Sequence, residues 1–316
     1  MPEQTAKRGV FLAEVASNEP LCREHYALRL PVEGFAATIP GQFVQIQCRR
    51  PVQPESYRVV DWPEGRPPEL SQSELTHAQP LLRRPFSLAG RRQNGPTAEL
   101  EIIYRAIGKG TSWMAKVAQG EQLSVLGPLG NGFGVSDTKS TAVLVGGGVG
   151  VPPLLYQAQA LASTGKRTFA FIGAGTADLL PLKTVGNVPS GPEPTGCVKR
   201  LAEIGVQSVV ATDDASLGFG GFVGEAFAQW LDSAGTPAED TVVYSCGPEA
   251  MMRTVGDVCI TRGIECLLAM ERHMACGMGT CQSCIVKIRD DSPKGWSYKL
   301  CCTDGPVFDA RDIIWD

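Results

Sequence analysis

The sequence VGGGVGVPPL, residues 145–154, decides the fold class of this 316-residue chain. It follows an apolar run at residues 142–145, which is typical of a strand buried on both faces of a parallel sheet. Residues 152–161 then have helical character, and proline suits the first helical turn because its missing N–H has no partner there. A strand, a glycine turn and a helix in this order predict one unit of an open α/β sheet.

Further short apolar stretches extend this unit toward the C-terminus. Residues 169–172, 208–211 and 242–245 each lie near helical or glycine-rich segments, an alternation typical of a parallel sheet. We therefore expect an α/β open parallel-sheet nucleotide domain over residues 138–265. The turn after residues 242–245 is expected at the carboxyl edge of this sheet, where open α/β folds bind their ligands.

Both turns suit a dinucleotide. Glycine lets pyrophosphate approach the backbone, and the helix that follows offers N–H groups at its N-terminus. The spacing is not G-x-G-x-x-G followed by an acidic residue about 20 positions on, so this is not the ordinary dinucleotide fingerprint. A tight turn without ligand is the alternative. Cys246, in the second turn, is either a contact to a nicotinamide ring or an ordinary buried thiol.

The residues before this sheet predict an all-β domain. Alternating stretches such as residues 43–47 and 100–104 are separated by Pro/Gly turns, and several strands at short spacing favour a barrel. We expect this β-barrel to span residues 1–137. Residues 50–82 and 186–196 have little periodicity and are interpreted as insertions on the surface.

Five of the eleven cysteines crowd into one short C-terminal segment, where we expect a small lobe over residues 266–316. Cys276, Cys281 and Cys284 have the C-x4-C-x2-C spacing of plant-type [2Fe–2S] ferredoxins. Gly277 and Gly279 let the chain turn tightly, so that thiolates point inward and backbone N–H groups face the sulfides.

Two alternatives remain for this segment. The C-x2-C part alone suits a structural zinc site, and the thiols could also be unrelated. A fourth ligand is expected from the adjacent pair Cys301 and Cys302, of which one ligates and the other packs, because neighbouring side chains tend to point in different directions.

Composition excludes several classes of protein. A net charge of −4 provides no basic patch for nucleic acid. We find no signal peptide and no apolar run of about 18 residues that would span a membrane, so we expect a cytoplasmic protein.

Several motifs occur in an order that resembles the ferredoxin–NADP reductase superfamily. They are RPFS at 84–87, IYRAIGKGT at 103–111, the glycine turn at 145–154 and CGPEAMM at 246–252. Each motif alone is unremarkable. The resemblance implies that Arg84 holds an FAD phosphate, that Ser87 holds the isoalloxazine, and that GKGT lies at the FAD pyrophosphate. It also implies that the two later motifs line a nicotinamide site.

Three further motifs resemble one branch, the electron-transfer subunits of NAD-linked dihydroorotate dehydrogenases. They are ERHMACG at 271–277, CTDGPVF at 302–308 and TDDAS at 212–216, in which Ala215 replaces the family's glycine. In that family the last iron ligand directly precedes x-D-G-P-V-F, which implies Cys302 rather than Cys301.

The resemblance implies a set of site residues. The iron ligands are Cys276, Cys281, Cys284 and Cys302. The residues that bind FAD and NAD are Arg84, Pro85, Phe86, Ser87, Ile103, Tyr104, Arg105, Gly110, Thr111, Gly147, Gly148, Gly150, Cys246, Gly247 and Pro248.

The implied function is electron transfer in pyrimidine biosynthesis. Electrons from dihydroorotate, oxidised on a separate FMN-containing catalytic subunit in a heterotetramer, would pass through a [2Fe–2S] cluster and FAD to NAD+. No catalytic acid–base residue is implied, and no histidine forms a triad with Ser or Cys. The alternatives are an NAD(P)H–ferredoxin or hydrogenase-linked diaphorase subunit and a non-catalytic iron–sulfur redox-sensing module. The two insertions leave the exact partner open.

Overall fold

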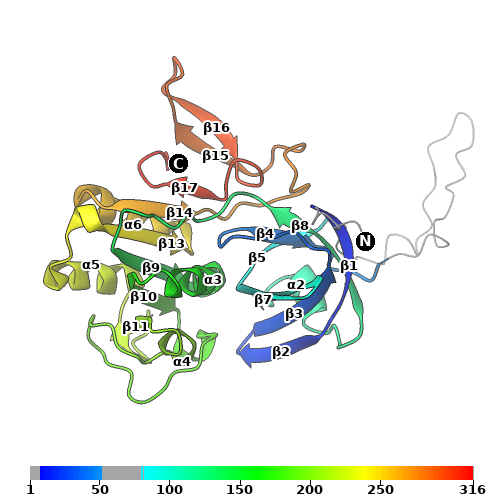
Figure 1. The fold of residues 1–316 in the computed structure, drawn as a ribbon, viewed down its shortest axis with the longest axis horizontal. Helices are drawn as coiled ribbons and strands as arrows, with labels where there is room; N and C mark the ends of the chain where they lie inside the picture. The colour runs from blue at the N-terminus through cyan, green and yellow to red at the C-terminus, as the bar shows by residue number, and fades with distance from the viewer. Residues whose placement is uncertain (1–7, 52–79, 81, 316) are drawn as a thin grey trace, which may run out of the picture.

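A computed structural model describes residues 8–51, 80 and 82–315 of the chain. Figure 1 shows a β-rich N-terminal part beside an α/β part, with a small lobe above them. This arrangement confirms the predicted fold class of barrel, open sheet and C-terminal lobe. The predicted insertion at residues 50–82 lies almost wholly outside the described residues.

Two four-stranded antiparallel sheets, in the orders β1-β8-β4-β5 and β2-β3-β7-β6, form the barrel-like domain. The register pairs Leu30 with Leu100 and Leu28 with Ile102, so apolar side chains of neighbouring strands share one buried face. The elements are β1 Gly9–Glu14, β2 Ser17–Cys22, β3 His25–Glu33, β4 Phe43–Ile46, β5 Arg84–Ser87, β6 Gly90–Asn94, β7 Thr97–Arg105, helix α2 Lys109–Met114 and β8 Gln122–Leu129.

A seven-stranded sheet in the order β12-β11-β10-β9-β13-β14-β17 forms the α/β part, and only the β14–β17 pair is antiparallel. Its strands are β9 Thr141–Gly147, β10 Arg167–Ala174, β11 Gln207–Thr212, β12 Phe219–Gly220, β13 Thr241–Cys246, β14 Glu265–Ala269 and β17 Val307–Asp309. Its helices are α3 Val151–Ala162, α4 Lys199–Ala202, α5 Val223–Ala234 and α6 Glu249–Thr261, with 3-10 turns η2 Gly148–Gly150, η3 Ala177–Leu179 and η4 Ala238–Asp240.

The centre of this sheet is buried on both faces. Side chains of α3 belong to one apolar core, and those of α5 and α6 belong to another. Every residue of β9 and β13 is buried as a result, which explains why β9 has a continuous apolar sequence. The chain runs outward from β9 in one direction and then returns to β13 on the other side, so the topological switch point lies between these two strands.

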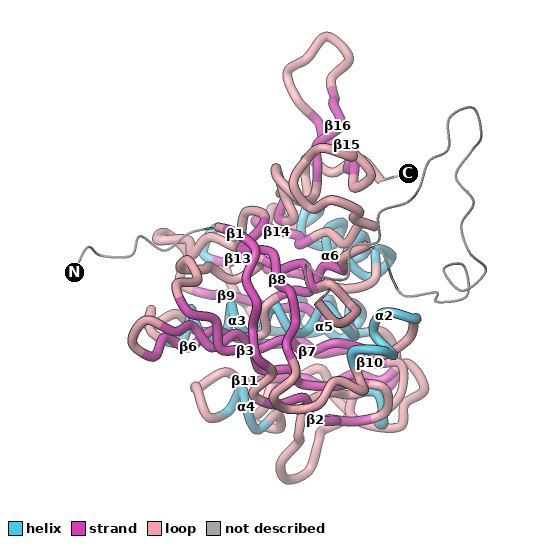
Figure 2. Tube along the Cα trace, turned by 90° about the vertical axis from the view of Figure 1, so that its right-hand side faces the viewer, coloured by secondary structure: helices cyan, strands magenta, loops and turns pink. Residues whose placement is uncertain are grey.

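The lobe consists of an antiparallel hairpin, β15 Ile285–Arg289 with β16 Trp296–Leu300. Figures 1 and 2 both show this hairpin projecting from the rest of the molecule. The chain then returns through β17 to the seven-stranded sheet, which β14 also joins. The division at residues 137 and 265 stays a prediction, since strands of the third region pair within the sheet of the second.

The second predicted insertion, residues 186–196, contains no helix or strand. Bridges between Thr184 and Val198 and between Thr195 and Ser208 fasten it to the α/β part. Within the ranges that the structure describes, no helix has the length and apolar character needed to cross a membrane.

Candidate functional site

The two predicted nucleotide turns lie in direct contact at the carboxyl edge of the sheet. β9 and β13 are adjacent and parallel, with Cys246 opposite Gly146. A Cβ atom on Gly150 would lie 2.2 Å from the carbonyl oxygen of Cys246, and one on Gly147 would lie 2.8 Å from the sulfur of Met251. The close approach of the two backbones therefore requires glycine at position 150. The structure brings Gly147, Gly148 and Gly150 beside Cys246, Gly247 and Pro248.

These turns have the features that a dinucleotide requires. Helix α3 begins at Val151 directly after the glycine turn, and proline occupies its first turn. Cys246 is 8% exposed, and burial together with the charge of Glu271 raises its pKa to about 12. Its thiol is therefore neutral, and only a small part of its surface is accessible to a ligand. The nicotinamide contact predicted for Cys246 stays a prediction.

The flavin motifs, which lie about 20 residues apart in the sequence, meet in the barrel. Phe86 packs edge-on against Tyr104, with ring centroids 6.0 Å apart. A Cβ atom on Gly110 would lie 3.6 Å from Cγ of Arg84 and 3.3 Å from the sulfur of Cys48. Gly110 therefore lets the GKGT segment pack directly against Arg84 at the start of the RPFS strand.

Several predicted flavin residues already have partners within the protein. The Tyr104 hydroxyl donates to Asn18 Oδ1 at 3.0 Å, and Arg105 forms an ion pair with Glu24 at 2.8 Å. The hydroxyl of Thr111 accepts hydrogen bonds from the backbone N–H groups of Ile107 and Gly108. Arg84 donates only to carbonyl oxygens nearby, those of Leu82 and Arg83, among the hydrogen bonds of the described residues. Arg84 is thus the best placed of these to bind a phosphate.

The cysteine loop is folded around one of its own sulfur atoms. The backbone N–H groups of Met278 and Cys281 both donate to Cys276 Sγ at 3.4 Å. Hydrogen bonding, chiefly with the Ser283 hydroxyl, lowers the pKa of Cys281 to about 6. These hydrogen bonds favour the thiolate of Cys281, the form that binds metal.

Cys301 and Cys302 point in different directions. Cys301 is fully buried and its thiol donates to the Met270 carbonyl oxygen at 3.1 Å, and burial raises its pKa. Burial raises the pKa of Cys302 to about 11, helped by a hydrogen bond with the Cys284 thiol and by the nearby Cys276. Both cysteines are buried in one core with Cys284, but the Cys301 thiol is directed at Met270 and the Cys302 thiol at Cys284, so we expect Cys302 to be the fourth ligand.

A tight turn holds Cys302 in this position. The N–H groups of Thr303, Asp304 and Gly305 all donate to the Leu300 carbonyl oxygen, and the Asp304 carboxylate accepts from the Leu300 N–H at 2.7 Å. Asn131 fastens the turn to the segment after β8, since its amide donates to the Asp304 and Val307 carbonyl oxygens.

The donor set fits an iron–sulfur core. The loop supplies sulfur ligands, left-handed glycines and N–H groups directed at sulfur. No three Cys, His, Asp or Glu side chains among the described residues converge on one point as ligands of a single ion. In a [2Fe–2S] core the four thiolates bind two different iron atoms, so the ligands spread over a wider site than those of a single ion.

Gly277→Ala is expected to weaken cluster binding by about tenfold or more. Gly277 has a φ of +71°, which costs alanine about 1–2 kcal/mol. A Cβ atom there would also lie 2.5 Å from Cδ of Gln45. Iron and sulfide per chain measure the effect. Gly279→Ala is the matched control, because Gly279 has a φ of +87° but its nearest neighbour is a Thr303 methyl group at 3.2 Å. Equal losses of iron in both variants would assign the effect to the left-handed backbone and exclude the contact with Gln45 as its cause.

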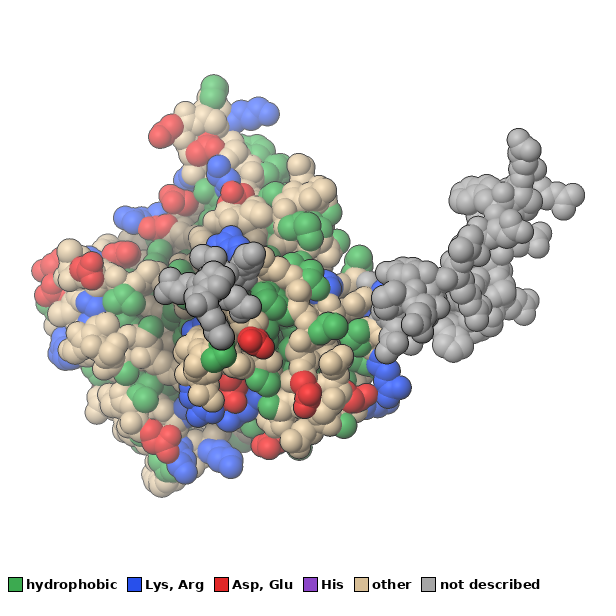
Figure 3. Space-filling model, turned by 45° about the vertical axis from the view of Figure 1, so that its right-hand side comes forward, with side chains coloured by type: hydrophobic (Ala, Val, Ile, Leu, Met, Phe, Trp, Pro, Cys, Tyr) green, Lys and Arg blue, Asp and Glu red, His purple; other side chains and the backbone are tan. Residues whose placement is uncertain are grey.

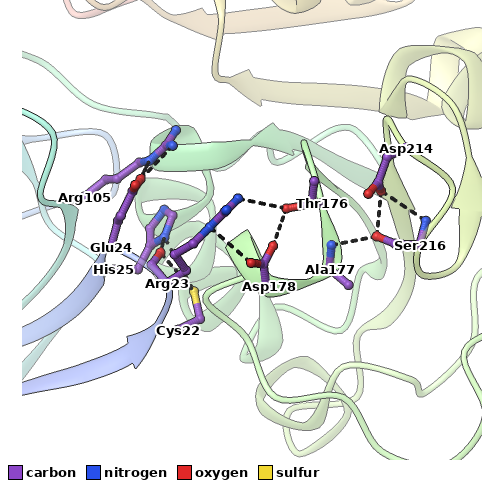
Figure 4. Close-up of polar contacts among 10 residues, drawn as sticks. All are labelled: Cys22, Arg23, Glu24, His25, Arg105, Thr176, Ala177, Asp178, Asp214 and Ser216. Atoms are coloured by element: carbon purple, nitrogen blue, oxygen red, sulfur yellow. Dashed lines mark hydrogen bonds and ion pairs between the residues drawn. The ribbon is translucent and has the colours of Figure 1, made fainter.

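A polar bridge joins the β2–β3 turn to the carboxyl edge of the sheet (Figure 4). Arg23 forms an ion pair with Asp178 at 3.1 Å and donates to the Thr176 hydroxyl. The N–H of Ala177 then donates to Ser216, whose own N–H and hydroxyl donate to Asp214. The turn of the TDDAS motif is thereby tied, through the loop after β10, to the barrel.

Ala215 in that motif adopts a φ of +60°, in the left-handed region. This backbone conformation explains why the resembling family has glycine at this position, because left-handed geometry costs a residue with a Cβ about 1–2 kcal/mol. Two hydrogen bonds stabilise the turn that contains Ala215. The Thr212 hydroxyl donates to the Leu217 carbonyl oxygen and accepts from the Leu217 N–H.

A cavity of about 710 Å³ lies elsewhere, between the barrel and the α/β part. It is lined by charged side chains that largely pair with one another, such as Arg29 and Arg200 with Glu101. Among the predicted site residues it touches only Ile103, so the cofactor assignment rests on the turns and the cysteine loop instead. Figure 3 shows Lys and Arg interspersed with Asp and Glu on one face, without an extended basic surface.

One residue that sequence reasoning missed lies between the flavin and cluster sites. Gln45 on β4 is fully buried, and neither polar atom of its side chain has a partner. A glutamine between apolar residues in a predicted strand was the available signal. This signal did not identify Gln45 as a site residue, because the sequence does not show what covers that face of the strand.

Comparison with known families identifies the C-terminal segment. Residues 271–314 match the family described as the iron–sulfur cluster binding domain of dihydroorotate dehydrogenase B. The "Dihydroorotate dehydrogenase B (NAD(+)), electron transfer subunit" of Bacillus mycoides (strain KBAB4) is 38% identical over 237 residues, which cover 74% of this chain and 81% of that protein.

Solved structures show a similar fold. An NADH-dependent reduced ferredoxin–NADP oxidoreductase aligns over 96% of this chain and 90% of its own, with a TM-score of 0.66 and 21% identity. A ferredoxin NADP+ reductase from Neisseria gonorrhoeae with bound FAD and NADP aligns over 85% of this chain and 96% of its own, with a TM-score of 0.58 and 14% identity.

Proposed function

The chain belongs to the family of dihydroorotate dehydrogenase B electron transfer subunits, and from that premise we propose that it delivers electrons from dihydroorotate to NAD+. The observation that carries the proposal is the coexistence of three sites in one chain. These are the adjoining glycine turns at the sheet edge, the RPFS and GKGT segments in the barrel, and the cysteine loop with Cys302. It is an oxidoreductase subunit that uses FAD, a [2Fe–2S] cluster and NAD.

Each group supplies one part of the chemistry: the cluster carries single electrons, and the flavin couples them to the two-electron hydride of the nicotinamide. The residues of this chain hold and orient these groups. Arg84 is proposed to bind an FAD phosphate through charge-assisted hydrogen bonds, and Gly110 lets the phosphate segment close on it. Ser87 on β5 and Tyr104 on β7, from the two sheets of the barrel, would line the flavin ring.

The nucleotide turns are proposed to bind NAD on the opposite side of the flavin site. Gly147, Gly148 and Gly150 directly precede helix α3, whose N-terminal N–H groups and dipole would favour a pyrophosphate. Gly247 and Pro248 shape the neighbouring wall, where a Cβ on Gly247 would lie 3.0 Å from the N atom of Gly147. The two turns are therefore in close contact, and a nicotinamide is proposed to bind along them.

A catalytic partner subunit is implied by the names of the relatives, which are electron transfer subunits. We propose that this partner contains FMN, that it oxidises dihydroorotate, and that the two kinds of subunit form a heterotetramer. No group described in this chain resembles a site for pyrimidine oxidation, and no acid–base residue is needed for the transfer of electrons.

The isolated chain is expected to oxidise NADH with an artificial acceptor and to leave dihydroorotate unchanged, because all its sites bind electron carriers. Adding the matching FMN subunit is expected to create dihydroorotate:NAD+ activity. Absorbance of NADH and quantification of orotate measure both reactions. Oxidation of dihydroorotate by the isolated chain would reveal a substrate site in this chain. Coupling to ferredoxin or to a hydrogenase subunit, without any coupling to the FMN subunit, would make the chain a diaphorase subunit instead.

A further inference from the structure

Gln45 occupies the boundary between the flavin strand and the cysteine loop. It lies on β4, where it pairs with Pro85 of the RPFS strand, and Phe43 pairs with Ser87. Val44 and Ile46 belong to the core of the barrel, whereas Phe43 belongs to the core that contains Cys284 and Cys302. Because side chains alternate along a strand, Gln45 shares the face of Phe43 and points toward the cluster lobe.

The amide of Gln45 lies directly on the cysteine loop. A Cβ atom on Gly277 would lie 2.5 Å from Cδ, 2.7 Å from Nε2 and 2.8 Å from Oε1 of Gln45. Gly277 follows Cys276, the cysteine whose sulfur already accepts two backbone N–H groups. The glutamine amide is therefore next to the site at which the proposed cluster would bind.

The amide has no partner among the described residues. Gln45 is 0% exposed, and both Nε2 and Oε1 lack a hydrogen bond. A buried polar atom without a partner costs about 1–3 kcal/mol, so the Nε2 donor calls for an acceptor. The cysteine loop lies beside this amide, and a bound cluster would present thiolate and sulfide sulfur atoms there as acceptors.

We propose that Gln45 donates a hydrogen bond to a sulfur atom of the [2Fe–2S] cluster and thereby raises its reduction potential. The inference rests on the proposed function, because it requires the cluster. Reduction adds negative charge to the sulfur atoms, and an N–H donor stabilises that charge. The same residue connects the strand of Ser87 to the cluster loop, so it also lies between the two proposed cofactors.

The test compares cluster potentials in the full-length holoprotein. Gln45→Leu removes the donor at similar volume, and Gln45→Met does so with the unbranched shape of glutamine. Both variants are expected to keep iron and sulfide at the level of the unsubstituted chain. The equilibrium constant for reducing the cluster is expected to fall about tenfold, which corresponds to about 59 mV for one electron. Redox titration followed by EPR of the reduced cluster measures this change.

Gln42→Leu is the matched control. Gln42 is also buried, but its Oε1 accepts from the Ile39 N–H at 3.1 Å and its Nε2 donates to the Gly130 carbonyl oxygen at 2.9 Å. This substitution is expected to lower the melting temperature and to leave the cluster potential unchanged. A shift as large as that of the Gln45 variants would indicate an indirect packing effect and overturn the proposal.

Three other results would overturn it. An unchanged cluster potential in both Gln45 variants would show that the amide does not bind the cluster. A change in the flavin potential alone would assign Gln45 to the flavin. Loss of iron from both variants, with flavin and melting temperature preserved, would make Gln45 a structural support of the loop. In contrast, an unsubstituted chain that binds no iron would refute the cluster itself and, with it, the proposed function.

Discussion

Cys302→Ser is expected to strip nearly all iron from the chain, whereas Cys301→Ser is expected to retain it. Cys302 lies with Cys284 and Cys276, while the Cys301 thiol is directed at the Met270 carbonyl oxygen in the core. Loss of one of four thiolates should weaken cluster binding by more than the about 10–100-fold typical of changes around metal ligands. Iron and sulfide counts, with the visible spectrum of the purified protein, measure the result.

The Cys301→Ser variant controls for the change of sulfur to oxygen at a buried position. A serine hydroxyl can still donate to Met270, so we expect a loss of stability of only about 1 kcal/mol. Thermal unfolding of both apoproteins checks that neither substitution destroys the fold. If Cys301→Ser loses the cluster and Cys302→Ser keeps it, the assignment of the fourth ligand is reversed.

Arg84→Ala is expected to release FAD from an otherwise folded chain. Two charge-assisted hydrogen bonds to phosphate contribute about 3 kcal/mol or more, so their loss weakens binding by about 100-fold or more. Arg84 donates to two carbonyl oxygens near the start of β5, and a phosphate group would be a stronger acceptor. Flavin absorbance per chain after gel filtration measures retention.

Arg83→Ala is the control for this prediction. The Arg83 guanidinium donates to both the carbonyl oxygen and the hydroxyl of Ser124 at 2.8 Å, so it joins β8 to the segment before β5. This variant is expected to lose stability and to retain FAD. A full flavin complement in Arg84→Ala would refute the role of Arg84, and equal flavin loss in both variants would assign the effect to the strand rather than to the phosphate.

Many individual strands, turns and loops could be predicted from the sequence, because they depend on residues that are close together in the chain. The apolar run of β9 and its glycine turn predicted a buried parallel strand and the helix α3 that follows it, and both are present. Alternation predicted β4 and β7 in the barrel. The ferredoxin spacing of Cys276, Cys281 and Cys284, with glycines between the first pair, predicted a loop around sulfur.

The order of the strands could not be derived in this way. That β13 lies beside β9, and that Gly150 therefore contacts the Cys246 carbonyl oxygen, depends on where the chain crosses the sheet. The return of β17 to this sheet likewise places it beside β14, on the other side of the cysteine loop and hairpin in the sequence. These contacts connect residues distant in sequence, and no local pattern encodes them.

The sequence by itself determined which residues are able to bind the cofactors: glycines that admit phosphate, an arginine before a strand, and thiols at ferredoxin spacing. Only the tertiary structure decided which of these side chains share a site. The adjacent Cys301 and Cys302 are chemically identical, and packing directs one at Met270 and the other at Cys284. Gln45 is an ordinary strand residue until the cysteine loop folds over it. Burial and direction are properties of the packed chain, because they depend on what lies opposite each residue.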